Sequence, residues 1–318
     1  MASEFELIRR HFVRPTRQTE LGVGDDGAIV RVRPGMELVV STDMLVSGTH
    51  FLPDVNPETL GWKALAVNVS DMAAMGAEPR WALLALSLPS ADEAWIQALA
   101  RGFFACAEAF GVDIIGGDTT RGPLNLAPTV FGEAPVGQSI RRAGARPGDE
   151  IWVSGTPGLA ALGLAHLQGR TVLHDPSPCV AALERPQPRV ALGLALRGLA
   201  TAAIDVSDGL LADLGHILEE SACGAELDDA ALPWGPVRAA CADAALARAC
   251  LTAGGDDYEL VFTAPPTHHA AIAALSGTLN LPLTLIGRII AAPSGQLVLK
   301  DASGQDVYVG RRGFDHFG

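Results

Sequence analysis

The sequence predicts a two-domain protein, an α+β domain followed by an α/β domain. Its 318 residues exceed one ordinary hydrophobic core and suit about two domains. Hydrophobic residues make up 48% of the chain and charged residues 19%, which is typical of a globular protein and unlike a disordered one. A polar, turn-rich stretch containing Pro147-Gly148 separates two groups of strand and helix patterns. We therefore place the boundary around residues 137–148 and the domains at 1–140 and 141–318.

The amino terminus, MASEFELIRRHF, predicts a short capped helix. Ser3 and Glu6 fit the S-x-x-E capping box, and Phe5, Ile8 and Phe12 lie on one helical face. Acidic residues stand where an export signal would need an apolar run. No uninterrupted apolar segment reaches the roughly 18 residues that a membrane-spanning helix requires. We expect a protein without a membrane segment.

The first half contains strand patterns with helical patterns between them. The expected strands are 28–32, 38–42, 82–88, 112–115 and 124–131. The expected helices are 60–74 and 92–110, and the second of these is clearly amphipathic. This order of elements is typical of a mixed α+β domain.

In the second half, helical and strand patterns alternate around a proline-rich connector, HDPSPCVAALERPQPR. The expected strands are 151–153, 202–206, 260–263 and 283–288. The expected helices are 159–167, 190–199, 210–220 and a segment around 266–275, with one further short helix in the connector. Alternation of this kind predicts an α/β domain.

The formal charge of −13 argues against nucleic acid as a partner, because phosphate backbones are bound by clustered Lys and Arg. It leaves small phosphorylated ligands open, since divalent cations can bridge two sets of anions. The five cysteines form no C-x-x-C pair, so neither a zinc site nor a disulfide framework is indicated. We expect a cytoplasmic protein.

Five short segments place an Asp after an apolar run and beside Gly, Ser or Thr. They are GVGDDG, VVSTDMLVSGTHF, NVSDMAAMGA, IIGGDTTRG and AIDVSDGLLADLG, and they carry Asp25, Asp26, Asp43, Asp71, Asp118, Asp205 and Asp208. Any one such Asp is more often a turn residue or a helix cap. Five together are better explained by a shared ligand, because a buried carboxylate needs a cation or a hydrogen-bond network.

Magnesium is the cation that suits these segments. The nearby basic residues are few, namely Lys63, Arg121 and Arg142. Mg²⁺ prefers hard oxygen ligands and keeps positions open for substrate phosphates. The sequence therefore predicts a site for magnesium and phosphates, in which a cation relieves the repulsion between Asp25 and Asp26; of the two, Asp26 is our choice as ligand.

Other nucleotide motifs do not account for the pattern. GVGDDG matches G-x-G-x-x-G, but charged and helical sequence precedes it and a strand follows, which is the reverse of a dinucleotide-binding turn. The chain contains neither G-x-x-x-x-G-K-[ST] nor G-x-S-x-G. Any ATP site must be built in another way.

Taken together, the motifs resemble the thiamine-monophosphate kinase family of the aminoimidazole-ribonucleotide-synthetase-like (PurM-like) ATP-binding superfamily. The matching segments run in order over nearly the whole chain: GVGDDGA, STDMLVSGTHF, KALAVNVSDMAAMGAEP, IGGDTTRGP, RRAGARPGD, AIDVSDGLLADLGHI, AGGDDYEL and GFDHF. Single motifs such as DVSDGL recur across the superfamily. The combination of STD…GTHF, NVSDMAAMGA and GFDHF is specific to the kinase.

The resemblance implies a fold, a reaction and a set of site residues. The amino-terminal PurM-like domain would form a barrel with a second copy through its sheet, giving a homodimer. ATP and thiamine monophosphate would react to ADP and thiamine diphosphate with several Mg²⁺ ions, and no catalytic side chain would be needed beyond metal and phosphate positioning. The implied metal ligands are Asp26, Ser41, Thr42, Asp43, Asp71, Asp118, Asp205 and Asp208; the implied ATP contacts are Gly117, Asp118, Arg142 and Ser207; the implied substrate contacts are His50, Asp256 and Phe314.

Two positions depart from the family pattern. Asp256 in GGDDYEL stands where the family often has Glu, and Phe314 stands where some members have Tyr or Trp. Stacking on a pyrimidine ring needs only the aromatic face, so we expect Phe314 to serve. We interpret Tyr258 and Glu259 as structural support for Asp256.

The alternatives are other members of the superfamily and a non-catalytic protein. A selenophosphate synthetase would need a reactive Cys near the amino terminus, whereas the first cysteine is Cys106. A hydrogenase-maturation relative would carry a carboxy-terminal cysteine, and GTHF with GFDHF disfavours aminoimidazole ribonucleotide synthetase. A metal-dependent nucleotide-binding scaffold would have lost some ligands of the transferring metal, and all the implied ligand positions are present.

Overall fold

The computed structural model describes residues 4–308, 310 and 312–315, and the chain forms two compact units. Unit 1 comprises Met1–Met72 and Ala77–Gly137. Unit 2 comprises Ala73–Gly76 and Gln138–Gly318. Ser3 of the predicted capping box and the last two residues of the GFDHF motif lie outside the described residues.

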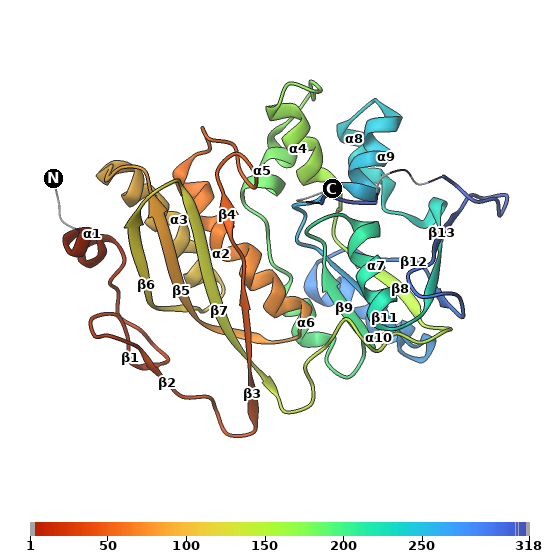
Figure 1. Cartoon of the computed structure of the whole chain (residues 1–318). Coiled ribbons are helices and arrows are strands. Elements are labelled where there is room, and N and C mark those ends of the chain that lie inside the picture. Colours follow the sequence, from red (N-terminus) through yellow and green to blue (C-terminus); the bar gives the residue numbers. More distant parts are fainter. Residues whose placement is uncertain (1–3, 309, 311, 316–318) are drawn as a thin grey trace. The chain divides into compact units, whose positions relative to one another are not determined.

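Unit 1 is built on a mixed sheet with the strand order β3-β7-β5-β6, and β4 pairs with β7 (Figure 1). Strands β5 and β6 are parallel, and the other pairs in this sheet are antiparallel. The strands of this sheet are β3 (Met36–Thr42), β4 (Leu45–Val46), β5 (Glu78–Leu88), β6 (Asp113–Arg121) and β7 (Asn125–Pro135). Strands β1 (Thr19–Leu21) and β2 (Ile29–Val30) pair with each other. The helices of unit 1 are α1 (Glu4–His11), α2 (Pro57–Ala74) and α3 (Glu93–Ala109).

Helices α2 and α3 cover one face of this sheet, and their mutual packing depends on two glycines (Figure 1). A Cβ on Gly61 of α2 would lie 2.0 Å from the carbonyl oxygen of Leu99, and a Cβ on Gly102 of α3 would lie 1.7 Å from that of Glu58. The two backbones therefore approach as closely as Gly allows. Asp92 begins α3 by accepting hydrogen bonds from two backbone N–H groups of its first turn, an N-cap that stabilises a helix by about 1 kcal/mol.

The opposite face of the unit 1 sheet carries apolar side chains that are open to solvent. In β3, Val39 is buried, whereas its neighbours Leu38 and Val40 are 44% and 52% exposed. Because side chains alternate along a strand, Leu38 and Val40 share the face away from Val39. The described part of the chain forms an open sheet here, and no closed barrel is found within it.

Unit 2 is built on a six-stranded sheet with the order β13-β10-β12-β8-β11-β9. Among the described strand pairs of this sheet, β10 with β13 is parallel and the others are antiparallel. Its strands are β8 (Glu150–Ser154), β9 (Ala202–Asp205), β10 (Gly224–Asp228), β11 (Leu260–Ala264), β12 (Leu283–Ile290) and β13 (Leu297–Lys300). Its helices are α4 (Leu159–Leu167), α5 (Ser177–Glu184), α6 (Val190–Ala195), α7 (Leu210–Glu220), α8 (Trp234–Ala240), α9 (Ala244–Ala253) and α10 (His269–Leu279), with short 3₁₀ turns η1 (Asp229–Ala231) and η2 (Pro266–His268).

Helices cover both faces of the unit 2 sheet, which explains why its strands read as continuous apolar runs. Ile151 and Val153 of β8 enter one core with Leu214 of α7. Trp152, the residue between them, enters a second core with Ile272 of α10. The predicted α/β class of this domain is confirmed, although most of its strand pairs are antiparallel.

The predicted elements differ from the observed ones mainly in extent. Helices α4 and α7 have the predicted bounds, and β5, β6 and β7 are longer than predicted. Strands β1, β4, β10 and β13 and helices α8 and α9 were missed. The strands are short, and β10, α8 and α9 follow one another with few residues between them, so no long periodic pattern develops.

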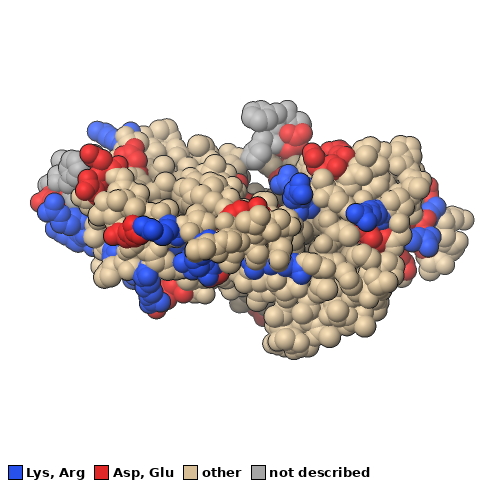
Figure 2. Space-filling model, turned by 90° about the horizontal axis from the view of Figure 1, so that it is seen from below, with Lys and Arg blue, Asp and Glu red and all other residues tan. Residues whose placement is uncertain are grey.

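Charged side chains of both signs are interspersed on the face shown in Figure 2, despite the overall charge of −13. Within the described residues, no helix has the combination of length and apolar character that crossing a bilayer requires.

Candidate functional site

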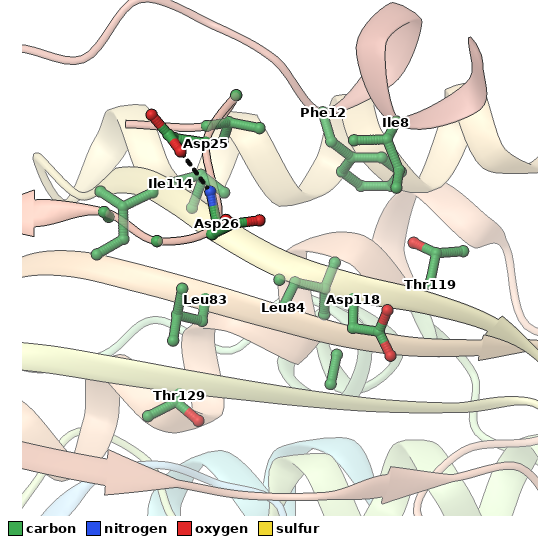
Figure 3. A pocket seen from close by; sticks show the side chains of 18 of the residues that line it. Ile8, Phe12, Asp25, Asp26, Leu83, Leu84, Ile114, Asp118, Thr119 and Thr129 are labelled. Atoms are coloured by element: carbon green, nitrogen blue, oxygen red, sulfur yellow. Dashed lines mark hydrogen bonds between the residues drawn. The ribbon is translucent and has the colours of Figure 1, made fainter. Parts of the chain in front are cut away.

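Unit 1 contains a cavity of about 610 Å³ over the open face of its sheet. Side chains of α1, the loop 23–28 and strands β5, β6 and β7 line it (Figure 3). Ile8 of α1 and Phe12, which directly follows this helix, are two of the three residues predicted to share one helical face, and they lie at one end (Figure 3). Asp25, Asp26 and Asp118 also line this cavity. The site therefore combines an apolar wall with three carboxylates.

The segment before β1, which leads through that strand into the loop with Asp25 and Asp26, is held by Asp113. The carboxylate of Asp113 accepts hydrogen bonds from the backbone N–H groups of Arg17 and Gln18 at 2.9 and 2.6 Å. Asp25 accepts the backbone N–H of Asp26 at 2.9 Å, so one oxygen of Asp25 serves the turn. Both aspartates are exposed. The carboxylate of Asp26 is the better placed of the two for an external ligand.

Asp118 lies within β6, because the strand continues beyond the predicted end at residue 115. Gly117 precedes it with φ +150°, and a Cβ there would lie 2.0 Å from the carbonyl oxygen of Leu84. Only Gly allows β5 to approach this closely at that conformation. Strand pairing sets Asp118 opposite Ala85 and leaves its side chain exposed at the cavity.

The end of β3 brings together a second group of predicted ligands. Ser41 donates a hydrogen bond to the carboxylate of Asp71 in α2 at 2.5 Å. The backbone N–H of Asp43 donates to Oδ1 of Asn68 at 2.9 Å, and Asn68 is fully buried. The hydroxyl of Thr42 donates instead to the carbonyl oxygen of Pro128, also at 2.9 Å. Ser41, Asp43 and Asp71 thus meet at the junction of β3 with α2, whereas the Thr42 hydroxyl is directed along the sheet.

His50 ends the turn that follows β4. Its Nδ1 accepts the backbone N–H of Val46 at 2.9 Å. A backbone N–H can only donate, so Nδ1 is the acceptor and the ring proton is assigned to Nε2. One ring nitrogen of His50 therefore supports the turn and the other is a donor.

In unit 2, Asp205 is the last residue of β9, and the loop that follows carries Ser207 and Asp208. Asp205 is 5% exposed at the end of the strand. Oδ2 of Asp213 accepts the backbone N–H groups of Ser207, Asp208 and Gly209, each at 3.0 Å. Burial raises the pKa of Asp213 to about 6, against the lowering effect of these hydrogen bonds.

The GGDDYEL segment packs against this loop through its backbone. The N–H of Asp256 donates to the carbonyl oxygen of Ser207, and the N–H of Tyr258 donates to that of Val206, both at 2.8 Å. The hydroxyl of Tyr258 donates to Asp256 at 3.3 Å, which confirms the predicted support. Glu259 has a different role, because its carboxylate binds Arg189 and the hydroxyl of Ser154.

Phe314 and Arg142 are both exposed. The backbone N–H of Phe314 donates to the carbonyl oxygen of Asp208 at 2.9 Å, so the described end of the chain lies on the Asp208 loop. Arg142 is attached through its own carbonyl oxygen, which accepts the hydroxyl of Ser221 at 3.1 Å. Its guanidinium is open to a ligand.

The oxygen-rich donor set fits Mg²⁺, which takes carboxylate and hydroxyl oxygens. Unit 1 places Asp26 and Asp118 at one cavity and joins Ser41 to Asp71, and unit 2 carries Asp205 at the end of β9 with Ser207 and Asp208 in the loop after it. In the part of the chain that the structure describes, no three His, Cys, Asp or Glu side chains are close enough to hold a metal by themselves.

The sequence reasoning missed three residues that hold these segments in place: Asn68, Asp113 and Asp213. Asn68 and Asp213 stand inside the quoted motifs NVSDMAAMGA and AIDVSDGLLADLG, so a polar residue in an apolar helical face was the available signal. Asp113 starts β6, and nothing in the sequence relates it to residues 17–19.

Two family domains match the chain. The AIR synthase related protein, N-terminal domain, matches residues 24–134. The AIR synthase related protein, C-terminal domain, matches residues 146–300.

Proteins of known identity match along the full length. The thiamine-monophosphate kinase of Escherichia coli strain K12 is 45% identical over 320 residues, which cover 99% of this chain and 98% of that protein. The crystal structure of thiamine-monophosphate kinase from Stenotrophomonas maltophilia K279a has a TM-score of 0.84 and 47% identity, over 91% of this chain and 92% of that one. AaThiL complexed with AMPPCP and TMP has a TM-score of 0.77 and 30% identity, over 93% of this chain and 92% of that one.

Proposed function

The chain belongs to the thiamine-monophosphate kinase family, and on this premise we propose that it transfers the γ-phosphate of ATP to thiamine monophosphate. The products are ADP and thiamine diphosphate, so the enzyme is an ATP-dependent phosphotransferase with a phosphate group as acceptor in thiamine diphosphate biosynthesis. The observation that carries the proposal is the cavity of unit 1, where Asp26 and Asp118 face the same space beside an apolar wall. Carboxylates can hold cation-bound phosphates, and an apolar wall can hold a base.

The reaction requires alignment more than acid–base chemistry. The nucleophile is an oxygen of thiamine monophosphate that is already ionised near neutral pH, so no side chain has to remove a proton. It attacks the γ-phosphorus in line with the bond to ADP, and that P–O bond breaks as the new one forms. Bound Mg²⁺ supplies the positive charge that offsets the repulsion between the two phosphate groups. The protein's own part is to hold both phosphates at the right distance and angle.

We assign the residues as follows. The Mg²⁺ ligands are Asp26, Ser41, Thr42, Asp43, Asp71, Asp118, Asp205 and Asp208. The ATP contacts are Gly117, Asp118, Arg142 and Ser207, with the domain 1–140 as the principal nucleotide and metal domain. The contacts to thiamine monophosphate are His50, Asp256 and Phe314. The exposed guanidinium of Arg142 and the Nε2 proton of His50 support these assignments, since both groups donate hydrogen bonds to phosphate.

A product assay tests the function. Purified protein is incubated with ATP, Mg²⁺ and thiamine monophosphate, and thiamine diphosphate and ADP are separated by chromatography. We expect equal amounts of both products, and little of either from Asp43→Asn. Asp54→Asn is the matched control, because Asp54 is an exposed loop residue eleven positions away, and we expect it to be fully active. Consumption of ATP without formation of thiamine diphosphate would contradict the substrate assignment. Binding of ATP without any turnover would favour the non-catalytic nucleotide-binding scaffold.

We also propose that the open face of the unit 1 sheet binds the same face of a second copy to form a homodimer with a shared barrel. The exposed apolar Leu38 and Val40 support this, because a second sheet would remove them from water. We expect wild-type protein to show twice the 33.0 kDa chain mass by light scattering and Val40→Glu to show the chain mass. Val172→Glu places the same charge on an 89% exposed residue of unit 2 and should remain dimeric.

We place the enzyme in the cytoplasm. All five cysteines are buried and none forms a disulfide in the described residues, which suits a reducing compartment, where structural disulfides are rare.

A further inference from the structure

Asp213 occupies an unusual position for a buried acidic residue. It lies in the first turns of α7, four residues after Gly209, and is 2% exposed. One of its two carboxylate oxygens, Oδ2, accepts hydrogen bonds from three consecutive backbone N–H groups, those of Ser207, Asp208 and Gly209. The N-terminal end of a helix favours a negative charge, so helix and hydrogen bonds act on this carboxylate in the same sense.

Three successive N–H groups that converge on one point form an anion-binding concavity. In many proteins such a concavity holds a phosphate. Here the chain fills it with its own carboxylate. The N–H groups of residues 207–209 are therefore used internally, and the loop can offer an external ligand only its side chains.

The carbonyl groups of the same loop hold the segments that carry the proposed substrate residues. The oxygen of Ser207 accepts the N–H of Asp256 at 2.8 Å, and the oxygen of Asp208 accepts the N–H of Phe314 at 2.9 Å. Gly255 is tightly packed at this junction, since a Cβ there would lie 2.2 Å from the oxygen of Ser207. A displacement of the loop would consequently move Asp256 and Phe314 together.

We propose that Asp213 is a positioning residue, which fixes the loop 206–209 from within and thereby sets Asp208 toward Mg²⁺ and Asp256 and Phe314 toward the acceptor substrate. This inference rests on the proposed function for the roles of those residues. The attachment of the loop to Asp213 does not depend on the proposed function, so an experiment can refute either one without refuting the other.

Amide hydrogen exchange of the metal-free protein tests the attachment directly. We expect Asp213→Ala to increase exchange in the peptide that contains residues 207–209 by about tenfold or more, because three N–H groups lose their acceptor. Asp149→Ala is the matched control. Asp149 is also buried, and it accepts the N–H of Arg146 and the hydroxyl of Thr201, at the opposite end of β9. It should destabilise unit 2 without raising exchange at residues 207–209.

The Mg²⁺ requirement of the kinase tests the consequence. We expect Asp213→Ala to raise the half-saturating Mg²⁺ concentration and the KM for thiamine monophosphate about tenfold each, with part of kcat recovered at high Mg²⁺, whereas Asp149→Ala changes neither constant. If Asp213→Ala does not fold, Asp213→Asn, which keeps the shape and an acceptor oxygen, should show the same changes in smaller measure. Unchanged exchange at residues 207–209, or equal effects of the Asp149 variant, would overturn the inference. An inactive wild type with the expected exchange pattern would refute only the proposed function.

Discussion

Gly117→Ala is the substitution for which the structure predicts the largest local effect at the cavity of unit 1. The new Cβ would lie 2.0 Å from the carbonyl oxygen of Leu84, whereas real Cβ atoms essentially never come closer than 3.0 Å. The strands β5 and β6 must therefore separate by about 1 Å (3.0 − 2.0) or more at this point. A non-glycine residue at φ +150° adds about 1–3 kcal/mol of backbone strain, and overpacking against a main chain adds about 1–3 kcal/mol. The expected destabilisation of unit 1 is about 2–6 kcal/mol.

Gly111→Ala separates the effect of crowding from that of backbone conformation. Gly111 has φ +67°, and no neighbouring atom lies within 4 Å of the position that a Cβ would take. Ala at this position therefore costs only the backbone strain of the left-handed conformation, about 1–2 kcal/mol. Urea unfolding of both variants should show the larger loss of unfolding free energy for Gly117→Ala. Because Asp118 moves with Gly117, and a displacement of 1 Å can reduce a rate about 10²-fold, kcat/KM for ATP should fall by about that factor. Gly111→Ala should remain within about twofold of wild type. Equal stability and equal activity of the two variants would refute the reasoning.

Two further predictions concern an ion-pair cluster of unit 1 and the thiols, none of which belongs to the proposed site. Arg33 and Arg80 both pair with the fully buried Glu133, and Arg33 also binds Glu78. Arg33→Met removes the Arg33 side chain from both carboxylates but leaves Arg80 beside them, so it should cost about 2 kcal/mol. Arg31→Met, which breaks an exposed pair, should cost below about 0.5 kcal/mol in the same urea titration. Burial would raise the pKa of Glu78, but Arg33, with a smaller contribution from Arg80, outweighs it and holds that pKa below its usual 4.5. This contribution is complete above about pH 4.5 and is lost as the pH falls through the folded-state pKa, and Arg33→Met should weaken this acid dependence. Burial raises the pKa of Cys250 to about 12, and all five thiols are buried. We therefore expect a disulfide reagent at pH 8 to label no thiol quickly in the native protein and all five in denaturant. Rapid labelling of thiols in the native protein would contradict this.

The layering of the fold was predictable because it depends on local periodicity. Helices α4 and α7 have the bounds that their apolar spacing predicts, and each follows a strand by a short glycine-containing turn. Pairing between strands was not predictable in the same way. The β5–β6 pair is parallel and the β5–β7 pair antiparallel, and nothing in β5 alone distinguishes its two neighbours. Register depends on residues far apart in the sequence, which periodicity does not report.

By itself, the sequence determined which chemistry the protein can carry. Its repeated Asp residues beside Gly, Ser and Thr supply hard oxygen ligands, and its motifs identify the family. Only the tertiary structure decided how those residues are held. Asp213 reaches back to three N–H groups of the loop before its helix, Asp113 holds residues almost a hundred positions away, and Gly117 exists because Leu84 approaches from another strand. The identity of a ligand is a property of one side chain, whereas its position is set by packing and hydrogen bonds between distant segments, which exist only in the folded chain.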